Sequence, residues 1–170
     1  DNVGACKELV TVLFAKGIQN IAYLGSNMDQ MVNRCRYQGY EEAYRKGKRK
    51  LNQDLVYTDL SSKAMVEKAV EELKKSGVEC ILCQDDYICD EAVRKLSHMG
   101  VRIPDQMKVA SCHYSRILEN YPVTVTSLKF NITELGRRSC QVLLDMIHGK
   151  TVPDKTLLDY EIILKESTKG

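Results

Sequence analysis

The sequence predicts an α/β fold: a doubly wound, mostly parallel sheet with helices on both faces, of the kind found in a type I periplasmic-binding-protein-like lobe. Short apolar runs that suit buried strands alternate regularly with longer segments whose apolar residues recur at helical spacing. Such alternation is typical of βαβ units, whose right-handed crossovers place helices over the sheet. A chain of 170 residues supports one ordinary domain.

The first half of the chain contains three expected helices and three expected strands. The helices span residues 3–16, 30–46 and 62–75, and the strands span residues 21–24, 55–57 and 80–84. Gly17 is placed to end the first helix, because glycine readily adopts the conformation that follows a helix. Ser61 or Ser62 is placed to cap the third helix, because a serine hydroxyl accepts from the free N–H groups at a helix start.

The second half continues the pattern with two helices and two strands. The helices span residues 86–99 and 131–148, and the strands span residues 107–112 and 159–165. Asp85 or Asp86 is expected to cap the first of these helices. Asn131 and Glu134 stand three residues apart, which resembles a capping box at the start of the second. The remaining stretches are expected to be loops, at 47–54, 113–122 and 149–156.

Charge and hydropathy exclude some classes of protein. The 25 basic and 23 acidic residues give a net charge of +2, so composition does not require a nucleic-acid partner. We interpret the basic run at 45–50 as a solvated helix end, where cations are favoured, rather than as a nucleic-acid patch. No apolar run reaches the length of a membrane span, and no signal peptide is recognisable.

Seven cysteines are many for this length, and their number is odd. Cys80, Cys83 and Cys112 lie in apolar, strand-like runs, where a free thiol behaves as a small buried hydrophobe. Cys80 and Cys83 have C-x-x-C spacing, but residues three apart in a strand point to opposite faces, which disfavours a shared metal or disulfide. This cysteine usage fits a reducing cytoplasm better than secretion.

Several short motifs occur in an order and at a spacing that resemble one protein family. They are Asp1-Asn2 with Gly4, Gly17 followed by Ile21–Gly25, Arg36 with Gly39 and Tyr40, Asp86–Ala92, Gly100–Asp105, a T-V-T-S segment at 124–127, and Leu135-Gly136 followed by Leu143, Leu144 and Gly149. Together they resemble the effector-binding core of LacI/GalR-family transcription regulators. The resemblance covers nearly the whole chain and implies a domain that binds a small molecule without catalysing a reaction.

The resemblance implies a division of the chain between two lobes. Family members have a DNA-binding headpiece followed by two similar α/β lobes joined by three crossover strands. Residues 1–128 and 153–170 would then form the C-terminal lobe, whereas residues 129–152 would carry a helix of a missing N-terminal lobe. Because the chain begins at Asp1 rather than at Met, we expect a cut fragment that lacks the headpiece and could have lost an upstream signal.

The helix expected at 131–148 would therefore present an apolar stripe without its native sheet. The stripe consists of Ile132, Leu135, Val142, Leu143, Met146 and Ile147. Exposed apolar surface costs roughly 25 cal/mol per Å². We expect this helix to pack on another copy, to fold back onto its own lobe, or to be disordered.

The implied function is control of operator binding by a small molecule, either a sugar, a sugar derivative or a nucleoside, held between the lobes. The resemblance further implies a cytoplasmic homodimer that contacts DNA only through the headpiece and needs no cofactor. The alternative is a periplasmic sugar-binding protein of a transporter, which shares the fold; the Gly100–Asp105 turn and the cysteines favour the regulator. An enzyme is disfavoured, because no nucleophile elbow, Walker loop or dinucleotide-binding glycine loop occurs.

Six residues are candidate ligand contacts, namely Arg36, Tyr57, Asp85, Asp86, His113 and Phe130. Four of them follow predicted strands and should share one rim of the sheet, where open parallel sheets bind ligands. Arg36 begins a helix that the family also points into its cleft, and its guanidinium offers a fork of donors. The aspartates offer acceptors, and the rings of Tyr57 and Phe130 offer apolar plates.

Each candidate also has a purely structural alternative. Arg36 could pair with a surface acid, Asp85 or Asp86 could cap a helix, and Tyr57 could belong to the core. His113 replaces the aspartate that often accepts from ligand hydroxyls in the family. That replacement argues against a standard sugar, and a protonated histidine would tolerate an anionic or carbonyl-bearing ligand. His113 could also be a loop histidine without a ligand. Phe130 stands where the family often has glutamine, which makes the cleft more apolar.

Overall fold

The computed structural model describes residues 1–169, which form one six-stranded sheet in the order β2-β1-β3-β4-β5-β6. The strands are β1 (Ile21–Leu24), β2 (Val56–Tyr57), β3 (Cys80–Cys83), β4 (Lys108–Ser111), β5 (Thr126–Phe130) and β6 (Tyr160–Ile163). All neighbours pair in parallel except β5 and β6, which are antiparallel. The predicted mostly parallel sheet is therefore confirmed.

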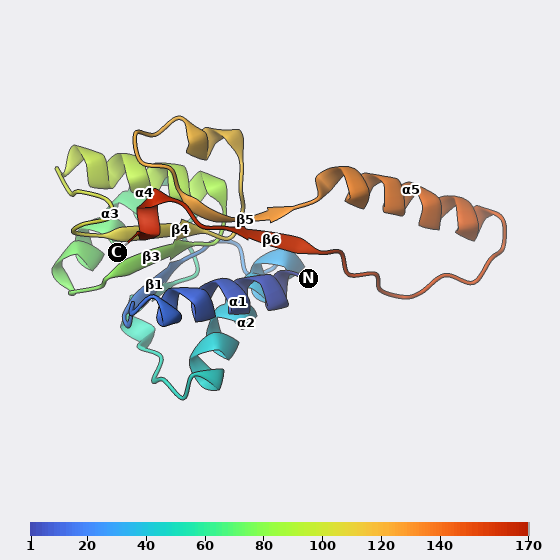
Figure 1. Ribbon diagram of the computed structural model, residues 1–170, viewed down its shortest axis with the longest axis horizontal. Helices are drawn as coiled ribbons and strands as arrows, with labels where there is room; N and C mark the ends of the chain where they lie inside the picture. The colour runs from blue at the N-terminus through green and yellow to red at the C-terminus, as the bar shows by residue number, and fades with distance from the viewer. Residues whose placement is uncertain (170) are drawn as a thin grey trace.

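Two pairs of helices cover the two faces of the sheet, and a fifth helix projects away from it (Figure 1). The helices are α1 (Asn2–Ala15), α2 (Met31–Lys46), α3 (Lys63–Lys75), α4 (Asp86–His98) and α5 (Ile132–Ile147). Helices α1 and α2 pack on one face, and α3 and α4 pack on the other. Short 3-10 turns occur at Gln53–Leu55, Arg116–Glu119 and Glu166–Thr168.

Alternating strand residues supply two separate apolar cores. Leu82 belongs to the core beneath α1 and α2, whereas Cys83 belongs to the core beneath α3 and α4, and both side chains are fully buried. A buried leucine contributes roughly 1.5–3 kcal/mol relative to an exposed one. Cys80 lies in the first core, so the two thiols of the C-x-x-C pair point to opposite faces, as predicted.

Helix starts follow the predicted capping residues. The Ser62 side chain accepts from Met65 N at 3.4 Å, and Asp85 Oδ1 accepts from Ile88 N at 2.9 Å. Asn131 Oδ1 accepts from Glu134 N at 2.9 Å. At the other end of α1, Gly17 has a φ of +89°, a value that favours glycine, so the predicted helix stop is confirmed.

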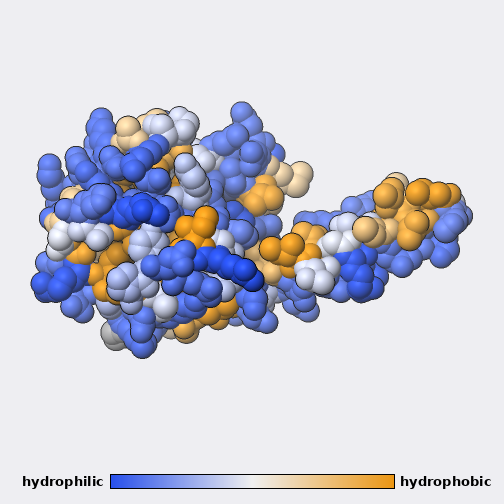
Figure 2. Space-filling view, turned by 90° about the horizontal axis from the view of Figure 1, so that it is seen from above, coloured by the Kyte–Doolittle hydropathy of each residue, from blue (hydrophilic) through white to orange (hydrophobic). Residues whose placement is uncertain are grey.

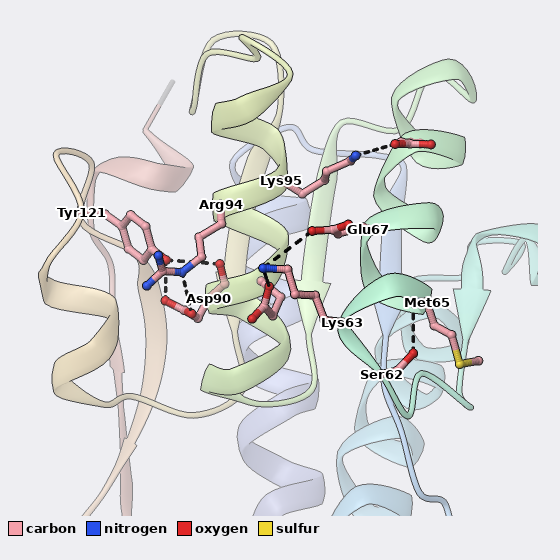
Figure 3. Close-up of polar contacts among 10 residues, drawn as sticks. Ser62, Lys63, Met65, Glu67, Asp90, Arg94, Lys95 and Tyr121 are labelled. Atoms are coloured by element: carbon pink, nitrogen blue, oxygen red, sulfur yellow. Dashed lines mark hydrogen bonds and ion pairs between the residues drawn. The ribbon is translucent and has the colours of Figure 1, made fainter.

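Polar side chains bridge α3 and α4 across the molecular surface, as Figure 3 shows. Lys63 Nζ lies 3.4 Å from Glu91 Oε2 and 3.8 Å from Glu67 Oε1, and Lys95 pairs with Glu71. Solvent-exposed ion pairs contribute about 0–1 kcal/mol each. The two helices are therefore held mainly by the apolar core beneath them, and the ion pairs set the charge of their outer surface.

The C-terminal segment packs at the amino ends of β4 and β5, at the end of the sheet opposite the rim. Ser167 is fully buried; its hydroxyl donates to Val109 O at 2.6 Å and accepts from Thr126 N at 2.9 Å. Beside it, Thr168 and Thr126 share a hydrogen bond of 2.6 Å between their hydroxyl oxygens. The last turn thus satisfies backbone groups where β4 and β5 begin, and residues 167 and 168 form part of the domain core.

Strand boundaries near the C-terminus differ from prediction. The strand expected at 159–165 is limited to β6, and Leu164, placed with its apolar face, is 50% exposed. Strand β5 was not predicted as a separate strand, because its residues, Thr126–Phe130, mix polar and apolar types without a clear period. The loop expected at 113–122 contains a 3-10 turn.

Helix α5 stands away from the lobe at the end of an arm formed by β5 and β6 (Figure 1). None of its residues is buried, and Ile132 and Ile147 are 67% and 69% exposed. Figure 2 shows apolar side chains gathered on the projecting part. The segment is a regular helix that does not fold back, so two of its three expected arrangements are wrong here. Packing on another copy stays a prediction.

Candidate functional site

Polar side chains form a rim at the carboxyl ends of the parallel strands. Asp85 and Asp86 follow β3, His113 follows β4, and Phe130 ends β5. Helix α2 begins at the same end of the sheet, after β1, and carries Arg36. In open parallel sheets this end binds ligands, because the strand ends leave a crevice and helix N-termini point toward it.

Arg36 is held in place by two uncharged partners. Only 9% of the residue is exposed; Nη1 donates to Gln84 O at 2.9 Å, and Nε donates to Asn2 Oδ1 at 3.3 Å. Within residues 1–169, Arg36 forms no ion pair with a carboxylate, so it does not have the alternative role of pairing with a surface acid. Its positive charge is therefore not neutralised by a carboxylate of the described residues.

Asp85 caps α4, which is the structural alternative considered for it. Its Oδ1 accepts from Ile88 N at 2.9 Å, and the second carboxylate oxygen is not used by the cap. Asp85 also lines a cavity of about 800 Å³ at the carboxyl ends of β1 and β2. The other polar residues of this cavity are Ser26, Asn27, Thr58, Asp59, Ser61, Ser62 and Lys63.

Asp86 and His113 are paired across the ends of β3 and β4. His113 Nδ1 lies 3.0 Å from Asp86 Oδ1, and the two side chains are 32% and 21% exposed. Burial alone would raise the pKa of Asp86, but the Ser115 hydroxyl and the His113 ring together lower it below its ordinary value. Asp86 is therefore an ionised partner for the histidine at neutral pH.

Phe130 and His113 line a second cavity, of about 440 Å³, where the arm leaves the sheet. The ring of Tyr160 also lines it, with its centroid 6.4 Å from that of Phe130. Two charged residues of the wall offset each other, because Lys129 Nζ lies 3.9 Å from Glu161 Oε2. The cavity therefore combines one histidine with three aromatic residues, Tyr114, Phe130 and Tyr160, and Asp159 leaves its wall with a net negative charge.

Tyr57 is the predicted candidate that the structure does not bring to this rim. Its hydroxyl donates to Glu72 Oε2 of α3 at 3.0 Å, and its ring packs against the core beneath α3 and α4. Burial and the Glu72 carboxylate raise its pKa to about 12. The role of a ring plate is therefore not supported for Tyr57, because β2 turns this side chain toward the core.

Gln84 is a central residue of the rim that sequence reasoning missed. It is fully buried; its Oε1 accepts from Ser26 N at 3.2 Å, and its carbonyl accepts from Arg36. Its Nε2 is buried without a partner within residues 1–169. Gly25 lies against it, since an added Cβ would stand 2.6 Å from Gln84 Oε1. In the sequence, the available signal for this role is that Gln84 directly follows the apolar run 80–83. The predicted strand 80–84 includes this residue.

A match to a known domain family identifies the family of this chain. The family described as the periplasmic binding protein-like domain matches residues 10–168. The chain belongs to this family. The carboxyl-end rim therefore belongs to a periplasmic binding protein-like domain, and the predicted fold class is confirmed.

Transcription regulators are among the similar proteins. The HTH-type transcriptional regulator CelR of Thermobifida fusca is 26% identical over 170 residues, which cover 98% of this chain and 50% of CelR. The chain spans about half the length of the curated relatives that it matches. The predicted resemblance to LacI/GalR regulators is confirmed by these relatives and by a LacI-family structure among the neighbours.

Solved structures have the same fold. The transcription regulator CcpA of Lactococcus lactis superimposes with a TM-score of 0.89 at 24% identity, over 99% of this chain and 63% of CcpA. A CelR–cellobiose complex superimposes with a TM-score of 0.88 at 26% identity, over 98% of this chain and 52% of CelR. At such identities, the CcpA comparison shows the fold of the periplasmic binding protein-like domain alone.

No helix among residues 1–169 is both long and apolar enough to cross a lipid bilayer. The same residues contain no cluster of three or more His, Cys, Asp or Glu side chains that could hold a metal ion.

Proposed function

We propose that this chain is the effector-sensing and dimerisation part of a LacI/GalR-type transcription regulator. In this proposal, residues 1–128 and 153–170 form the C-terminal lobe, which supplies one wall of an effector cleft. Residues 129–152 carry a helix that completes an N-terminal lobe, and a separate headpiece contacts DNA. The row formed by Arg36, the Asp86–His113 pair and Phe130 at the carboxyl end of the sheet is the observation that carries the proposal.

The chemistry of this row suits a hydroxylated ring compound. Arg36 offers donors from a rigid guanidinium, the unused oxygens of Asp85 and Asp86 offer acceptors, and Phe130 offers an apolar face. Such a combination fixes the orientation of a sugar, a sugar derivative or a nucleoside, since polar groups set direction and an aromatic ring covers the apolar side. We therefore propose an effector of this class.

Effector binding would act on DNA through the angle between two lobes. A ligand held by both lobes favours the arrangement in which both make contact, and it stabilises that arrangement by its difference in affinity. In a dimer, a change of this angle would alter the spacing of two DNA headpieces. The regulator would work in the cytoplasm without a cofactor, and we propose no catalytic role.

The alternative function is a periplasmic sugar-binding protein of a transporter. The relatives CelR, RegA and GntR are all named as HTH-type transcriptional regulators, which favours the regulator. The buried, unpaired cysteines also fit a reducing compartment better than an oxidising one.

A thermal-shift screen tests the proposal. The complete gene product and the 170-residue chain would each be screened against glucose, cellobiose, glucose 6-phosphate, gluconate and cytidine. A ligand at 100 times its Kd stabilises a protein by about 2.7 kcal/mol. We expect stabilisation of the complete protein by one class and a much smaller shift of the chain, because the chain has one cleft wall. No shift of the complete protein by any compound would contradict the proposal.

A further inference from the structure

The surroundings of the Asp86–His113 pair determine which nitrogen of the His113 imidazole carries the proton. Nδ1 lies 3.0 Å from Asp86 Oδ1, and an ionised carboxylate only accepts hydrogen bonds. The Ser115 hydroxyl and the His113 ring lower the pKa of Asp86, despite its partial burial, so this carboxylate is ionised at neutral pH. In the neutral imidazole, the proton must therefore lie on Nδ1, and Nε2 must carry a lone pair.

Nε2 of His113 has no hydrogen-bond partner among the described residues. Within residues 1–169, no protein group forms a hydrogen bond with it, and it is not among the buried polar atoms that lack a partner. About a third of the side chain remains exposed, and His113 lines the cavity of about 440 Å³. Because Nδ1 is occupied by Asp86, Nε2 is the ring nitrogen that remains for a ligand in this cavity.

We infer that Asp86 fixes His113 in the Nδ1–H tautomer, so that Nε2 serves as a hydrogen-bond acceptor for a hydroxyl group of a neutral ligand. The inference rests on the proposed function and names its ligand class: a neutral polyol or sugar rather than an anion. It also explains how a histidine replaces an aspartate without losing the acceptor, since the oriented ring presents a lone pair where a carboxylate would present an oxygen.

The rest of the cavity wall agrees with a neutral ligand. The Lys129 ammonium is offset by Glu161 at 3.9 Å, and Asp159 adds a negative charge to the same wall. An anion placed against Nε2 of the neutral His113 ring would meet a lone pair, which repels it. A hydroxyl donates to that lone pair and keeps its apolar side against Phe130.

Nuclear magnetic resonance of the 170-residue chain tests the tautomer directly. Long-range correlations between ring protons and ¹⁵N nuclei distinguish a protonated nitrogen from a bare one, at about pH 8, where an ordinary histidine is neutral. His113→Asn identifies the signals of His113 among the three histidines. We expect a protonated Nδ1 and a bare Nε2 in the unaltered chain, and a shift toward the Nε2–H tautomer in Asp86→Ala. A dominant Nε2–H tautomer in the unaltered chain would overturn the inference.

Two substitutions of His113 test the ligand class in the complete protein. His113→Asn keeps a donor that can reach Asp86 but removes the group at the Nε2 position, whereas His113→Gln keeps an amide oxygen close to that position. With a neutral sugar that shifts the unaltered protein, such as cellobiose or glucose, we expect His113→Asn to raise Kd roughly tenfold and His113→Gln about threefold or less.

Different results would contradict the inference about His113 and the proposed function. Unchanged affinity of His113→Asn for the neutral sugar, or stabilisation of the unaltered protein by gluconate and glucose 6-phosphate alone, would overturn the inference and leave an effector-binding function standing. A complete protein that responds to none of the compounds would contradict the proposed function, while the tautomer measurement would still decide the state of the ring.

Discussion

The guanidinium of Arg36 donates to the backbone carbonyl of Gln84 at 2.9 Å, which ties α2 to the carboxyl end of β3. The carbonyl belongs to a fully buried residue, and the Arg36 side chain is almost buried with it. An unpaired buried carbonyl costs about 1–3 kcal/mol. The contact therefore contributes to stability and also holds the charge at the rim.

Arg36→Met should separate these two contributions, because methionine keeps an unbranched apolar stem and loses the donors. We expect a loss of about 1–3 kcal/mol in the free energy of unfolding, measured by urea denaturation, and loss of the ligand-induced thermal shift in the complete protein. Arg45→Met is a matched control on the same helix, since the Arg45 side chain is 80% exposed. Equal stabilities of the two variants would show that the Gln84 contact contributes nothing.

Ser167→Ala should destabilise the domain although residue 167 lies at the end of the described chain. The substitution leaves Thr126 N and Val109 O without their partner at a buried site. We expect a loss of about 1–3 kcal/mol in the free energy of unfolding by urea denaturation. Ser139→Ala, in exposed α5, is the control and should change stability by less than about 0.5 kcal/mol. A Ser167→Ala chain as stable as the unaltered one would contradict the structural role.

Asp86 should make the free energy of unfolding of the chain depend on pH in the acid range. Its pKa is lower in the folded chain than its ordinary value of about 3.9, so its contribution is present above that value and is lost as pH falls through the folded pKa. We expect Asp86→Asn to be less stable than the unaltered chain near neutral pH and to approach it as the pH falls below about 4. Urea denaturation at several pH values measures this.

The exposed Asp29 gives a control for the acid dependence. Asp29→Asn should retain the pH profile of the unaltered chain, because this side chain has no hydrogen-bonded histidine beside it. A constant difference between Asp86→Asn and the unaltered chain at every pH would mean that the carboxylate acts by packing and not by its charge.

The apolar stripe of α5 should drive association of the chain with itself. Leu143 and Ile147 are 58% and 69% exposed, and covering apolar surface gains about 25 cal/mol per Å². We expect sedimentation to give a mass that rises with concentration, and the double variant Leu143→Lys, Ile147→Lys to be monomeric. Gln141→Lys with His148→Lys adds two charges to the same segment but outside the stripe, and this variant should still associate. A monomer at all concentrations in the unaltered chain would contradict the expectation.

Local signals in the sequence predicted most elements of the fold, because each is a short-range property of the chain. The caps Ser62, Asp85 and Asn131 precede amphipathic segments, and the strand 80–83 is uniformly apolar. The antiparallel direction of β6 was not predicted, since strand direction is decided by where the chain returns and not by its side chains. Strand β5 was missed for lack of periodicity.

The sequence predicted which residues lie near the rim, but it did not predict the hydrogen bonds between them. Strand ends placed Asp86 and His113 at one edge, yet their hydrogen bond depends on the parallel register that joins Cys83 to Ser111. Tyr57 also ends a strand, but its hydroxyl donates to Glu72 of α3. The side-chain direction at a strand end depends on register and twist, which a single sequence does not reveal.

The arm leaves the sheet through β5 and returns through β6, whose residues Phe130 and Tyr160 face each other in the antiparallel register. Everything from 131 to 159 is therefore an excursion whose two ends meet side by side. Joining those ends with a tight two-residue turn would convert the arm into an ordinary hairpin. The order of the other strands is the same with or without this excursion, so a longer or shorter insertion between residues 130 and 160 reroutes no other strand.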